Sequence, residues 1–424
     1  MRPLNILVYA HHYRTEPIGI GAYTGEMCEW LKARGHRVRV VCPPPHYPQW
    51  AVEAPYKEWR YQRETIAGVE IIRCPIWVPA KPRGWQRVLS LLIFAILSSP
   101  VMVREMSRRP DIAFVIEPSF LDTVVCLFLA RCFGRVCWLH IQDFEIDIAF
   151  ELGQFRHRRI RTVMNRFESW VMRQFDVVST ISRRMLRRVE AKGVDPARSV
   201  FFPNWVDTGL IFPQAQASAL RHELGIAADR VVALFSGTLG TKQSVETLID
   251  VAMLLKDHDE IEFIICGNGA EALQARARGL ANIRFLPLQP FDRLNDLLNL
   301  ADIHLLPQKL KVADLVMPSK LINMVASGRP VVCGANPDTE IAEVGAQCGL
   351  VVEPENPEAM ADAVLYLANN RRERIRLGEA ARKYALRHLD HERILGNFEA
   401  FLYGYGSGGV DLLQTTAPLN GSAV

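Results

Sequence analysis

Short apolar runs of strand length alternate with helical segments along most of this chain. NILVYA opens the series, an amphipathic stretch at 26–33 ends at Gly35, and RVRVVC follows at 37–42. Parallel strands need a crossover connection, so a strand–helix alternation of this kind is typical of parallel sheets covered by helices. The sequence therefore predicts an α/β fold.

The alternation breaks once, at the proline-bracketed segment 203–213, and a second series then begins with VVALFSG. A chain of 424 residues is too long for a single core. We predict two doubly wound, Rossmann-like domains, 1–203 and 204–385, with a ligand cleft between the carboxyl ends of their strands. We expect 386–404 to be a helix that packs back on the first domain, and 405–424 to be a disordered tail.

The two halves of the chain differ in charge. Residues 1–200 carry 30 Lys and Arg against 19 Asp and Glu, whereas the rest carries 20 against 27, and all eight tryptophans lie at or before Trp205. A basic, Trp-rich half is typical of proteins that contact an anionic membrane surface or nucleic acid. Because no zinc-finger, RNA-binding or helix-turn-helix signature is present, we expect a membrane surface and no nucleic acid.

One segment, 88–103, is almost entirely apolar and has basic residues on both sides. Its sixteen residues, with Pro100 among them, are few for a transmembrane helix. We predict a membrane-facing segment, 81–109, whose helix lies in the interface; a core helix and a true span are the alternatives. The basic runs 156–161 and 183–188 either extend this face or are solvated helix surfaces.

The nine cysteines form no C-x-x-C pair and stand mostly in apolar runs, as reduced core residues of cytosolic proteins do. The first apolar run is too short for the hydrophobic part of a signal peptide. We therefore expect a cytoplasmic protein.

Residues 316–333, VMPSKLINMVASGRPVVC, carry the clearest chemical signal. Ser319 and Lys320 open a short helical run, Gly328 ends it, and a strand-like run follows. A helix start directs free backbone N–H groups at one point, and with a lysine ammonium beside them this arrangement is suited to a diphosphate. The alternative is an ordinary helix–strand unit with an exposed lysine.

Three further loops carry glycines directly after predicted strands. Gly237 lies in SGTLGTK with Lys242 nearby, and Gly267 and Gly269 lie in CGNG. Such glycines either give the backbone access to a nucleotide or simply form tight turns. The first loop, with Gly19 and Gly21, misses the dinucleotide fingerprint by one residue, and Cys42-Pro43 stands where a ribose-binding carboxylate is expected, which argues against a nicotinamide dehydrogenase.

His140 ends the strand-like run VCWLHI, and an acidic cluster follows with Asp143, Glu145 and Asp147. A histidine at the carboxyl end of a strand lies either at the cleft or in the core. One of the three carboxylates is a candidate for taking a proton from an acceptor hydroxyl.

Taken together, these motifs resemble the GT-B glycosyltransferases of family 4, and within them the colanic-acid-type fucosyltransferase group of bacterial exopolysaccharide synthesis. The resemblance covers about residues 4–400 and rests on GIGAYTGEMCEWLKARGHRVRVVCPPPHYPQW and LVMPSKL…ASGRPVV. It implies retaining transfer from a GDP- or UDP-linked sugar, with no cofactor and no metal in the site. The C-terminal domain would hold the nucleotide and the N-terminal domain the acceptor.

The resemblance also implies roles for single residues. Lys242 matches the family's diphosphate-binding lysine, and His140 matches the histidine that contacts the donor sugar. Thr238 stands where many members have arginine, so Lys320 would supply charge there. The expected catalytic residues are His140, Lys242 and Asp143. The expected nucleotide-sugar contacts are Gly19, Gly21, Gly237, Thr238, Lys242, Gly267, Gly269, Ser319, Lys320, Leu321, Asn323 and Glu340.

The family's pair of glutamates eight positions apart is not intact. Its second member falls at Asn323 and its first at Leu315, next to Asp314. Asn323 would bond a ribose or sugar hydroxyl, and Glu340 or Glu343 would supply other sugar contacts. Departure of the diphosphate as the acceptor attacks from the same side lets a phosphate oxygen take the proton, so a protein base is not required.

The expected acceptor is a polyprenyl-diphosphate-linked saccharide, met on the inner face of the plasma membrane, and the expected donor sugar is fucose. The aromatic run Tyr47, Trp50, Tyr56 and Trp59 fits a saccharide. Two alternatives stay open: a nucleotide-sugar epimerase or hydrolase on the same fold, and a non-catalytic membrane-associated scaffold.

Overall fold

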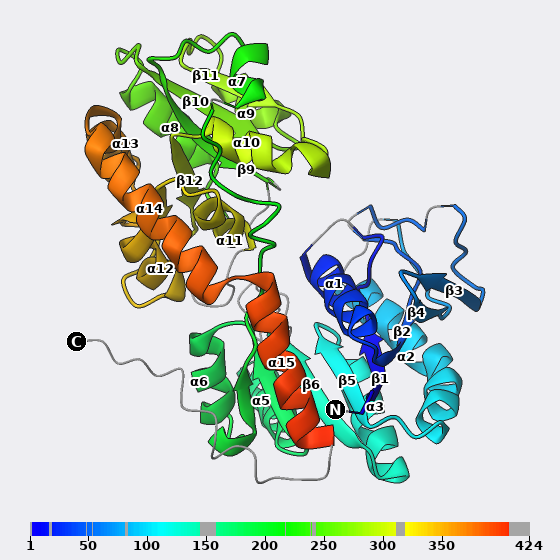
Figure 1. The fold of residues 1–424 in the computed structure, drawn as a ribbon. Coiled ribbons are helices and arrows are strands. Elements are labelled where there is room, and N and C mark those ends of the chain that lie inside the picture. Colours follow the sequence, from blue (N-terminus) through cyan, green and yellow to red (C-terminus); the bar gives the residue numbers. More distant parts are fainter. Residues whose placement is uncertain are drawn as a thin grey trace. The chain divides into compact units, whose positions relative to one another are not determined.

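The computed structural model describes residues 2–16, 19–47, 49–52, 54–80, 84–144, 158–216, 218–237, 239, 243–310 and 319–406. It divides into two compact units, the first made of Met1–Pro203 and Leu395–Val424 and the second of Asn204–Ile394. Each unit has one β-sheet with helices packed against it (Figure 1). The predicted α/β architecture with two Rossmann-like sheets is confirmed.

The first unit holds an eight-stranded sheet in the order β3-β4-β2-β1-β5-β6-β7-β8. Every pair is parallel except β3 with β4 at one edge. The strands are β1 (Asn5–Ala10), β2 (Arg37–Cys42), β3 (Gln62–Ile66), β4 (Val69–Arg73), β5 (Ile112–Glu117), β6 (Val136–Ile141), β7 (Val177–Thr180) and β8 (Ser199–Phe201). Strand order reverses between β1 and β5, and ligands of such sheets bind at this point, beyond the carboxyl ends of the strands.

The helices of the first unit connect these strands, except for α15, which returns from the second unit at the end of the chain. They are α1 (Gly19–Ala33), α2 (Gly84–Ser107), α3 (Phe120–Phe133), α5 (Arg158–Met172), α6 (Arg183–Ala191), the short η1 (Pro196–Arg198) and the C-terminal α15 (His391–Gly406). The prediction that Gly19 and Gly21 lie in a loop is wrong, because α1 already begins at Gly19. A Cβ on Gly21 would stand 3.2 Å from the carbonyl oxygen of Tyr13, so glycine lets this first turn pack closely on the segment after β1.

Helix α15 returns to the first unit. Phe398 stacks on Phe202 with ring centroids 4.1 Å apart, and its ring lies 5.4 Å from that of Trp138. Glu399 accepts hydrogen bonds from Arg34 and His36. The chain passes back into this unit at Leu395, later than the expected 386. The expected tail lies outside the described residues, apart from Tyr405 and Gly406, which end α15.

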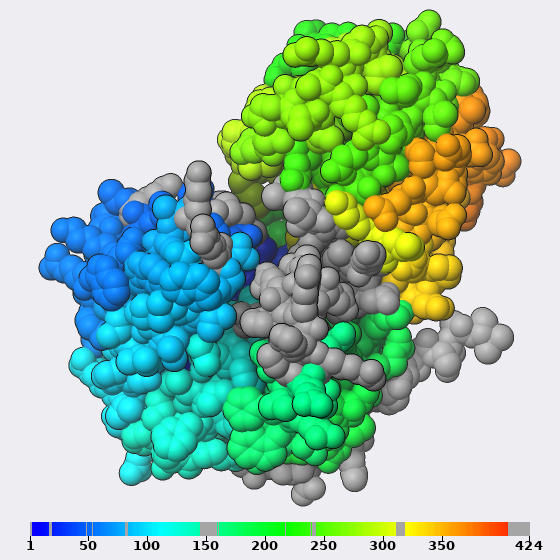
Figure 2. Space-filling view, turned by 180° about the vertical axis from the view of Figure 1, so that it is seen from behind, coloured from blue at the N-terminus to red at the C-terminus, as the bar shows by residue number. Residues whose placement is uncertain are grey.

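Helix α2 contains the apolar segment noted in the sequence and has two different sides. Its inner side packs on α3 and buries Phe94, Ser98 and Glu105, the last of which pairs with Arg39. Trp85, Leu92 and Ile96 are exposed. By length and composition this helix is apolar enough to cross a membrane, with 28% of its most apolar window buried. Figure 2 shows the light-blue and cyan segment that contains α2 and α3 on the surface of the first unit.

The second unit holds a fully parallel six-stranded sheet in the order β11-β10-β9-β12-β13-β14. Its strands are β9 (Val231–Ser236), β10 (Ile261–Cys266), β11 (Ile283–Leu286), β12 (Ile303–Pro307), β13 (Val331–Gly334) and β14 (Gly349–Val352). Its helices are α7 (Ala219–Glu223), α8 (Glu246–Leu254), α9 (Glu271–Arg276), η2 (Phe291–Arg293), α10 (Leu294–Leu300), α11 (Ser319–Ala326), α12 (Glu340–Cys348), α13 (Pro357–Asn369) and α14 (Arg371–His388). Here strand order reverses between β9 and β12.

Candidate functional site

Glycines pack the chain tightly at the carboxyl edge of the second sheet. Gly237 follows β9 with φ at 127°, and its N–H donates to the carbonyl of Cys266 at 2.9 Å. A Cβ on Gly267 would stand 2.4 Å from the oxygen of Gly237. Gly269 has φ at 81° but open space around it. Gly267 is therefore required by close backbone contact, Gly237 by its positive φ and a neighbouring side chain, and Gly269 by its conformation alone.

Lys320 reaches from α11 to this edge. Its ammonium donates to Gln243 Oε1 at 2.6 Å and lies 4.5 Å from the centre of the Phe235 ring. A Cβ on Gly237 would stand 2.4 Å from Lys320 Cε, so the glycine makes room for the lysine stem. Burial lowers the pKa of Lys320 to about 8. A buried ammonium at a sheet edge and beside a helix start is a binding group for a phosphate.

The other residues expected at the nucleotide lie around α11 and α12. Ser319 and Asn323 are partly buried on α11, whereas Leu321 is fully buried and contributes its side chain to the core. Glu340 lies in the first turn of α12, which is capped by Thr339 Oγ1 accepting from the N–H of Ala342 at 3.2 Å. Thr238, Lys242, Asp314 and Leu315 lie outside the described residues.

His140 is held in the interior of the first unit. Its Nδ1 lies 2.9 Å from Ser179 Oγ, and its Nε2 lies 3.1 Å from Gln142 Nε2. The ring packs between Phe114 and Phe202, and burial lowers its pKa to about 3. His140 is therefore a neutral, hydrogen-bonded imidazole at the end of β6, and its expected contact with a donor sugar stays a prediction.

Of the acidic cluster after His140, the structure describes only Asp143, which is partly buried. Glu145 and Asp147 lie outside the described residues.

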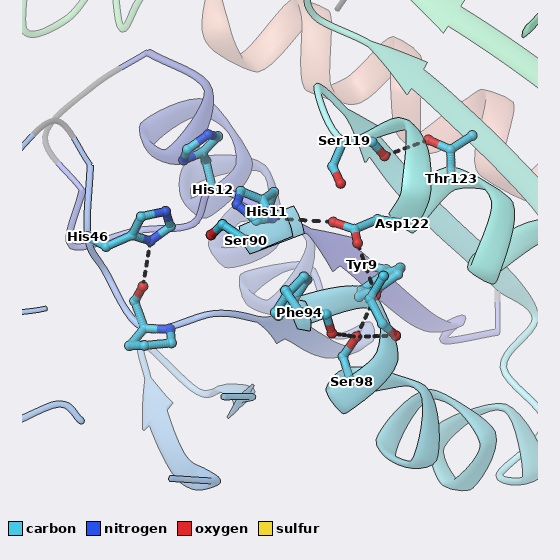
Figure 3. A network of polar contacts seen from close by, with 12 residues as sticks. Tyr9, His11, His12, His46, Ser90, Phe94, Ser98, Ser119, Asp122 and Thr123 are labelled. Carbon is cyan, nitrogen blue, oxygen red and sulfur yellow. Dashed lines mark hydrogen bonds and ion pairs between the residues drawn. The ribbon is translucent and has the colours of Figure 1, made fainter. Parts of the chain in front are cut away.

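A polar cluster that the sequence analysis missed lies at the carboxyl ends of β1 and β5, where the strand order reverses (Figure 3). Tyr9 Oη lies 2.6 Å from Ser98 Oγ and donates to Asp122 Oδ1 at 3.3 Å. Asp122 Oδ2 lies 3.4 Å from His11 Nδ1. Burial raises the pKa of Asp122 to about 7, and burial lowers that of His11 to about 3.

The loops after β1 and β2 complete this cluster. His12 Nδ1 lies 2.7 Å from Glu16 Oε2, and Glu16 Oε1 accepts from the backbone N–H groups of His46 and Tyr47 at 3.0 and 3.1 Å. The rings of His11, His12 and His46 lie within 6.0 Å of one another. The sequence signal was HHY directly after the first strand, with a third histidine following the second strand. Within the described residues no group of three or more His, Cys, Asp or Glu is placed to hold a metal ion.

Comparison with known proteins identifies the class of the molecule. A family model for the glycosyl transferase 4-like domain matches residues 19–205, and one for glycosyl transferases group 1 matches 216–384. The solved structure of sucrose-phosphate synthase from Thermosynechococcus elongatus shares the fold, with a TM-score of 0.75 and 14% identity over 96% of this chain and 100% of that one. Anabaena HepE in complex with UDP-glucose has a TM-score of 0.68 and 15% identity over 94% and 100%. The molecule is thus a GT-B glycosyltransferase.

A relative from Escherichia coli (strain K12) narrows the class. WcaI, named as a colanic acid biosynthesis glycosyl transferase, is 38% identical over 410 residues, which is 93% of this chain and 98% of WcaI. The chain belongs to glycosyltransferase family 4, as the motif resemblance predicted.

Proposed function

We propose that this glycosyltransferase moves a sugar from a nucleotide-sugar to a polyprenyl-diphosphate-linked saccharide during exopolysaccharide synthesis of the colanic acid type. The observation that carries the proposal is Lys320, a partly buried ammonium held against Gly237 and Gln243 at the carboxyl edge of the second sheet. The identity to WcaI over nearly the full length of both chains supports the pathway. Fucose carried by GDP is the donor we expect.

The chemistry we propose is stabilisation of the leaving group. A diphosphate that departs from the sugar gains negative charge, and a fixed ammonium in a water-poor pocket offsets that charge without reorganising. Lys320 supplies one such ammonium, and Lys242, which lies outside the described residues, is proposed to supply the second. Transfer with retention of configuration, and without a metal or other cofactor, completes the proposal.

The first experiment is a thermal-shift screen against GDP, UDP, GDP-fucose, GDP-mannose and UDP-glucose, with and without magnesium. One nucleotide should raise the melting temperature selectively, because a ligand that binds only the folded state stabilises it. Lys320→Ala should abolish the shift and lower kcat by about 10²–10³-fold, the usual cost of removing one preorganised charge-stabilising group. Lys256→Ala, a matched exposed lysine in the same unit, should change neither. An unchanged shift in Lys320→Ala would contradict the assignment.

We also propose that the first unit docks on the anionic inner face of the plasma membrane through α2. The side of α2 that carries Trp85, Leu92 and Ile96 is exposed and apolar. Because Glu105 on its other side is fully buried and paired with Arg39, an interfacial position costs less than a span. Helix α5 supports the same surface with exposed Val163, Phe167 and Trp170 between exposed arginines.

Vesicle flotation tests this surface. The protein should float with vesicles of phosphatidylethanolamine and phosphatidylglycerol, and less with vesicles of neutral lipid. The double variant Leu92→Ser/Ile96→Ser should float several-fold less well. Leu254→Ser, which changes an exposed leucine of the second unit, should float normally.

A further inference from the structure

Glu16 is the best-held carboxylate at the edge of the first sheet. Its side chain is 3% exposed, and it accepts three hydrogen bonds, two from the backbone N–H groups of His46 and Tyr47 and one from His12. Burial raises its pKa, but the hydrogen bond and charge of His12 outweigh burial and bring the pKa to about 2. Glu16 is therefore an ionised acceptor at neutral pH.

An ionised Glu16 fixes the tautomer of His12. A carboxylate has no proton to donate, so the contact of 2.7 Å requires the proton to be on His12 Nδ1. In the neutral ring Nε2 then carries a lone pair. Within the described ranges no hydrogen bond reaches this nitrogen, and the side chain is 19% exposed. A carboxylate that orients an imidazole in this way is the arrangement that turns histidine into a base for a hydroxyl.

The two neighbouring histidines differ from His12. His46 is buried and donates from Nδ1 to the carbonyl of Pro44 at 3.0 Å, and buried His11 faces Asp122. The charged and titratable groups around His12 are Glu16 and His11 on its own segment, His46 and Tyr47 from the loop after β2, and Asp122 from α3. Only His12 combines an anchored carboxylate with partial exposure.

The surroundings of His12 are suited to a sugar. The Tyr47 ring lies 5.5 Å from that of His12 and is 38% exposed, and Trp50 packs edge-on against Tyr47 at 6.1 Å. The guanidinium of Arg87 lies 5.3 Å from the centre of the Trp50 ring. Aromatic faces beside a few fixed polar groups are the usual lining of carbohydrate and other small-molecule sites.

We propose that His12, oriented by Glu16, binds the attacking hydroxyl of the saccharide acceptor and takes its proton. This inference rests on the proposed function. The acceptor oxygen forms a bond to the anomeric carbon of the donor sugar, and its O–H bond breaks with the proton passing to His12 Nε2. The bond from the anomeric carbon to the diphosphate oxygen breaks, and its electron pair leaves with the nucleoside diphosphate. The imidazolium then returns its proton to water. Neither a phosphate oxygen nor Asp143, Glu145 or Asp147 is needed for this step.

Imidazole tautomers are read directly by NMR, and this test needs no substrate. With nitrogen-15 histidine labelling, the wild type should show His12 protonated at Nδ1. Glu16→Gln keeps an oxygen for the two backbone N–H groups but places an NH₂ group against His12, so the proton should move to Nε2. A wild-type His12 protonated at Nε2, or no change in Glu16→Gln, would overturn the proposal.

Kinetics give the second test, with water as the acceptor so that no lipid is required. We would follow release of UDP or GDP from UDP-glucose, GDP-fucose and GDP-mannose between pH 5 and 9. The wild-type rate should depend on pH, because an imidazole accepts a proton only in its neutral form. In His12→Gln the rate should fall by about 10²–10⁴-fold and its dependence on pH should be lost, while the nucleotide thermal shift stays intact. The matched control is His222→Gln, an exposed histidine of the second unit, and it should behave as wild type.

The outcomes separate the two proposals. A wild-type protein that binds none of the nucleotides overturns the proposed function. A wild-type protein that turns over, with His12→Gln showing the same rate and pH profile, overturns the role of His12 and leaves the proposed function standing.

Discussion

The carboxyl edges of the two parallel sheets carry different chemistry at the same topological position. At the carboxyl ends of β1 and β5 in the first unit, Tyr9, His11 and Asp122 form a buried network, and the pair His12–Glu16 lies beside it. At the carboxyl ends of β9 and β12 in the second unit, glycines allow close packing of the chain and Lys320 reaches over them. The edge of the first sheet is rich in side chains that donate or accept protons. The edge of the second sheet presents closely packed backbone and a positive charge.

This difference shows how two sheets of similar topology carry different side-chain chemistry. The parallel sheet sets where a site is, because its strands all end at one edge. The loops and helix starts set which groups stand there, and here they supply histidines and carboxylates to one unit and glycines with Lys320 to the other. The two edges should therefore respond differently to pH, to loss of a side chain and to filling of space.

The largest expected effect concerns Asp122. Burial raises its pKa to about 7, so the folded state binds this proton more tightly than the unfolded state does. The protonated carboxyl group contributes its full stabilisation to the folded state below about pH 4, and this contribution is lost as the pH rises to 7. The loss is about 4 kcal/mol, because each pKa unit corresponds to about 1.36 kcal/mol. Asp122→Asn stays neutral, so the difference in unfolding free energy between the two proteins should change by this amount across that range.

Urea unfolding followed by tryptophan fluorescence measures this difference, because seven of the eight tryptophans lie in the first unit. The buried, neutral His46 acts with the opposite sign in both proteins, whereas His11 faces Asp122 and is part of the effect of the substitution. Glu70→Gln, an exposed carboxylate of the same unit, is the matched control and should follow the wild type. If the free energies of unfolding of Asp122→Asn and wild type changed in parallel with pH, Asp122 would not be buried as described.

The second prediction compares two glycines at the edge of the second sheet. Gly237→Ala and Gly269→Ala both force alanine into a positive φ, at a cost of about 1–3 kcal/mol of stability. Only at Gly237 would the new methyl group meet Lys320, 2.4 Å from Cε. The lysine must then move, so nucleotide affinity should fall about tenfold in Gly237→Ala and hold in Gly269→Ala. If Gly237→Ala and wild type bound the nucleotide with equal affinity in isothermal calorimetry, Gly237 would not be part of the binding site.

The smallest effect is proton uptake at Lys320. Burial lowers its pKa to about 8, and a bound diphosphate favours the ammonium, so nucleotide binding at pH 8 should take up a fraction of a proton. Affinity should weaken by up to about 1.4 kcal/mol for each pH unit above 8. Calorimetry of UDP and GDP in buffers of different ionisation enthalpy measures the uptake. Lys320→Arg, which stays charged, should bind without it; uptake that persists there would point to another group.

Much of the fold was predictable because it follows from local pattern. Buried parallel strands are continuous apolar runs, so NILVYA and VVALFSG identified β1 and β9, and the alternation gave two Rossmann-like sheets. The run VEIIR identified β4, but its antiparallel partner β3 was missed, since QRETI has no apolar run. The start of α1 was also misplaced, because glycine has a low helix propensity and only packing on Tyr13 explains why the helix begins at Gly19.

The sites divide in the same way. Lys320 could be found from sequence because Pro-Ser-Lys, the helix and the strand are adjacent in the chain. The pairing of His12 with Glu16 is local too, but HHY alone did not say which histidine was exposed. That depended on Asp122 and His46, which lie at least 30 residues from their partners His11 and Glu16 and reach them only through the order of the strands.

By itself, therefore, the sequence determined the two sheets, the basic and acidic halves and the lysine at the second edge, because each is written in short-range periodicity or composition. Tertiary structure alone decided that His140 is a neutral core imidazole, that Gly237 exists to admit Lys320, and that Glu16 holds His12 ready to accept a proton. Burial and hydrogen-bond partners set the charge and tautomer of a side chain, and both are supplied by segments distant in the chain.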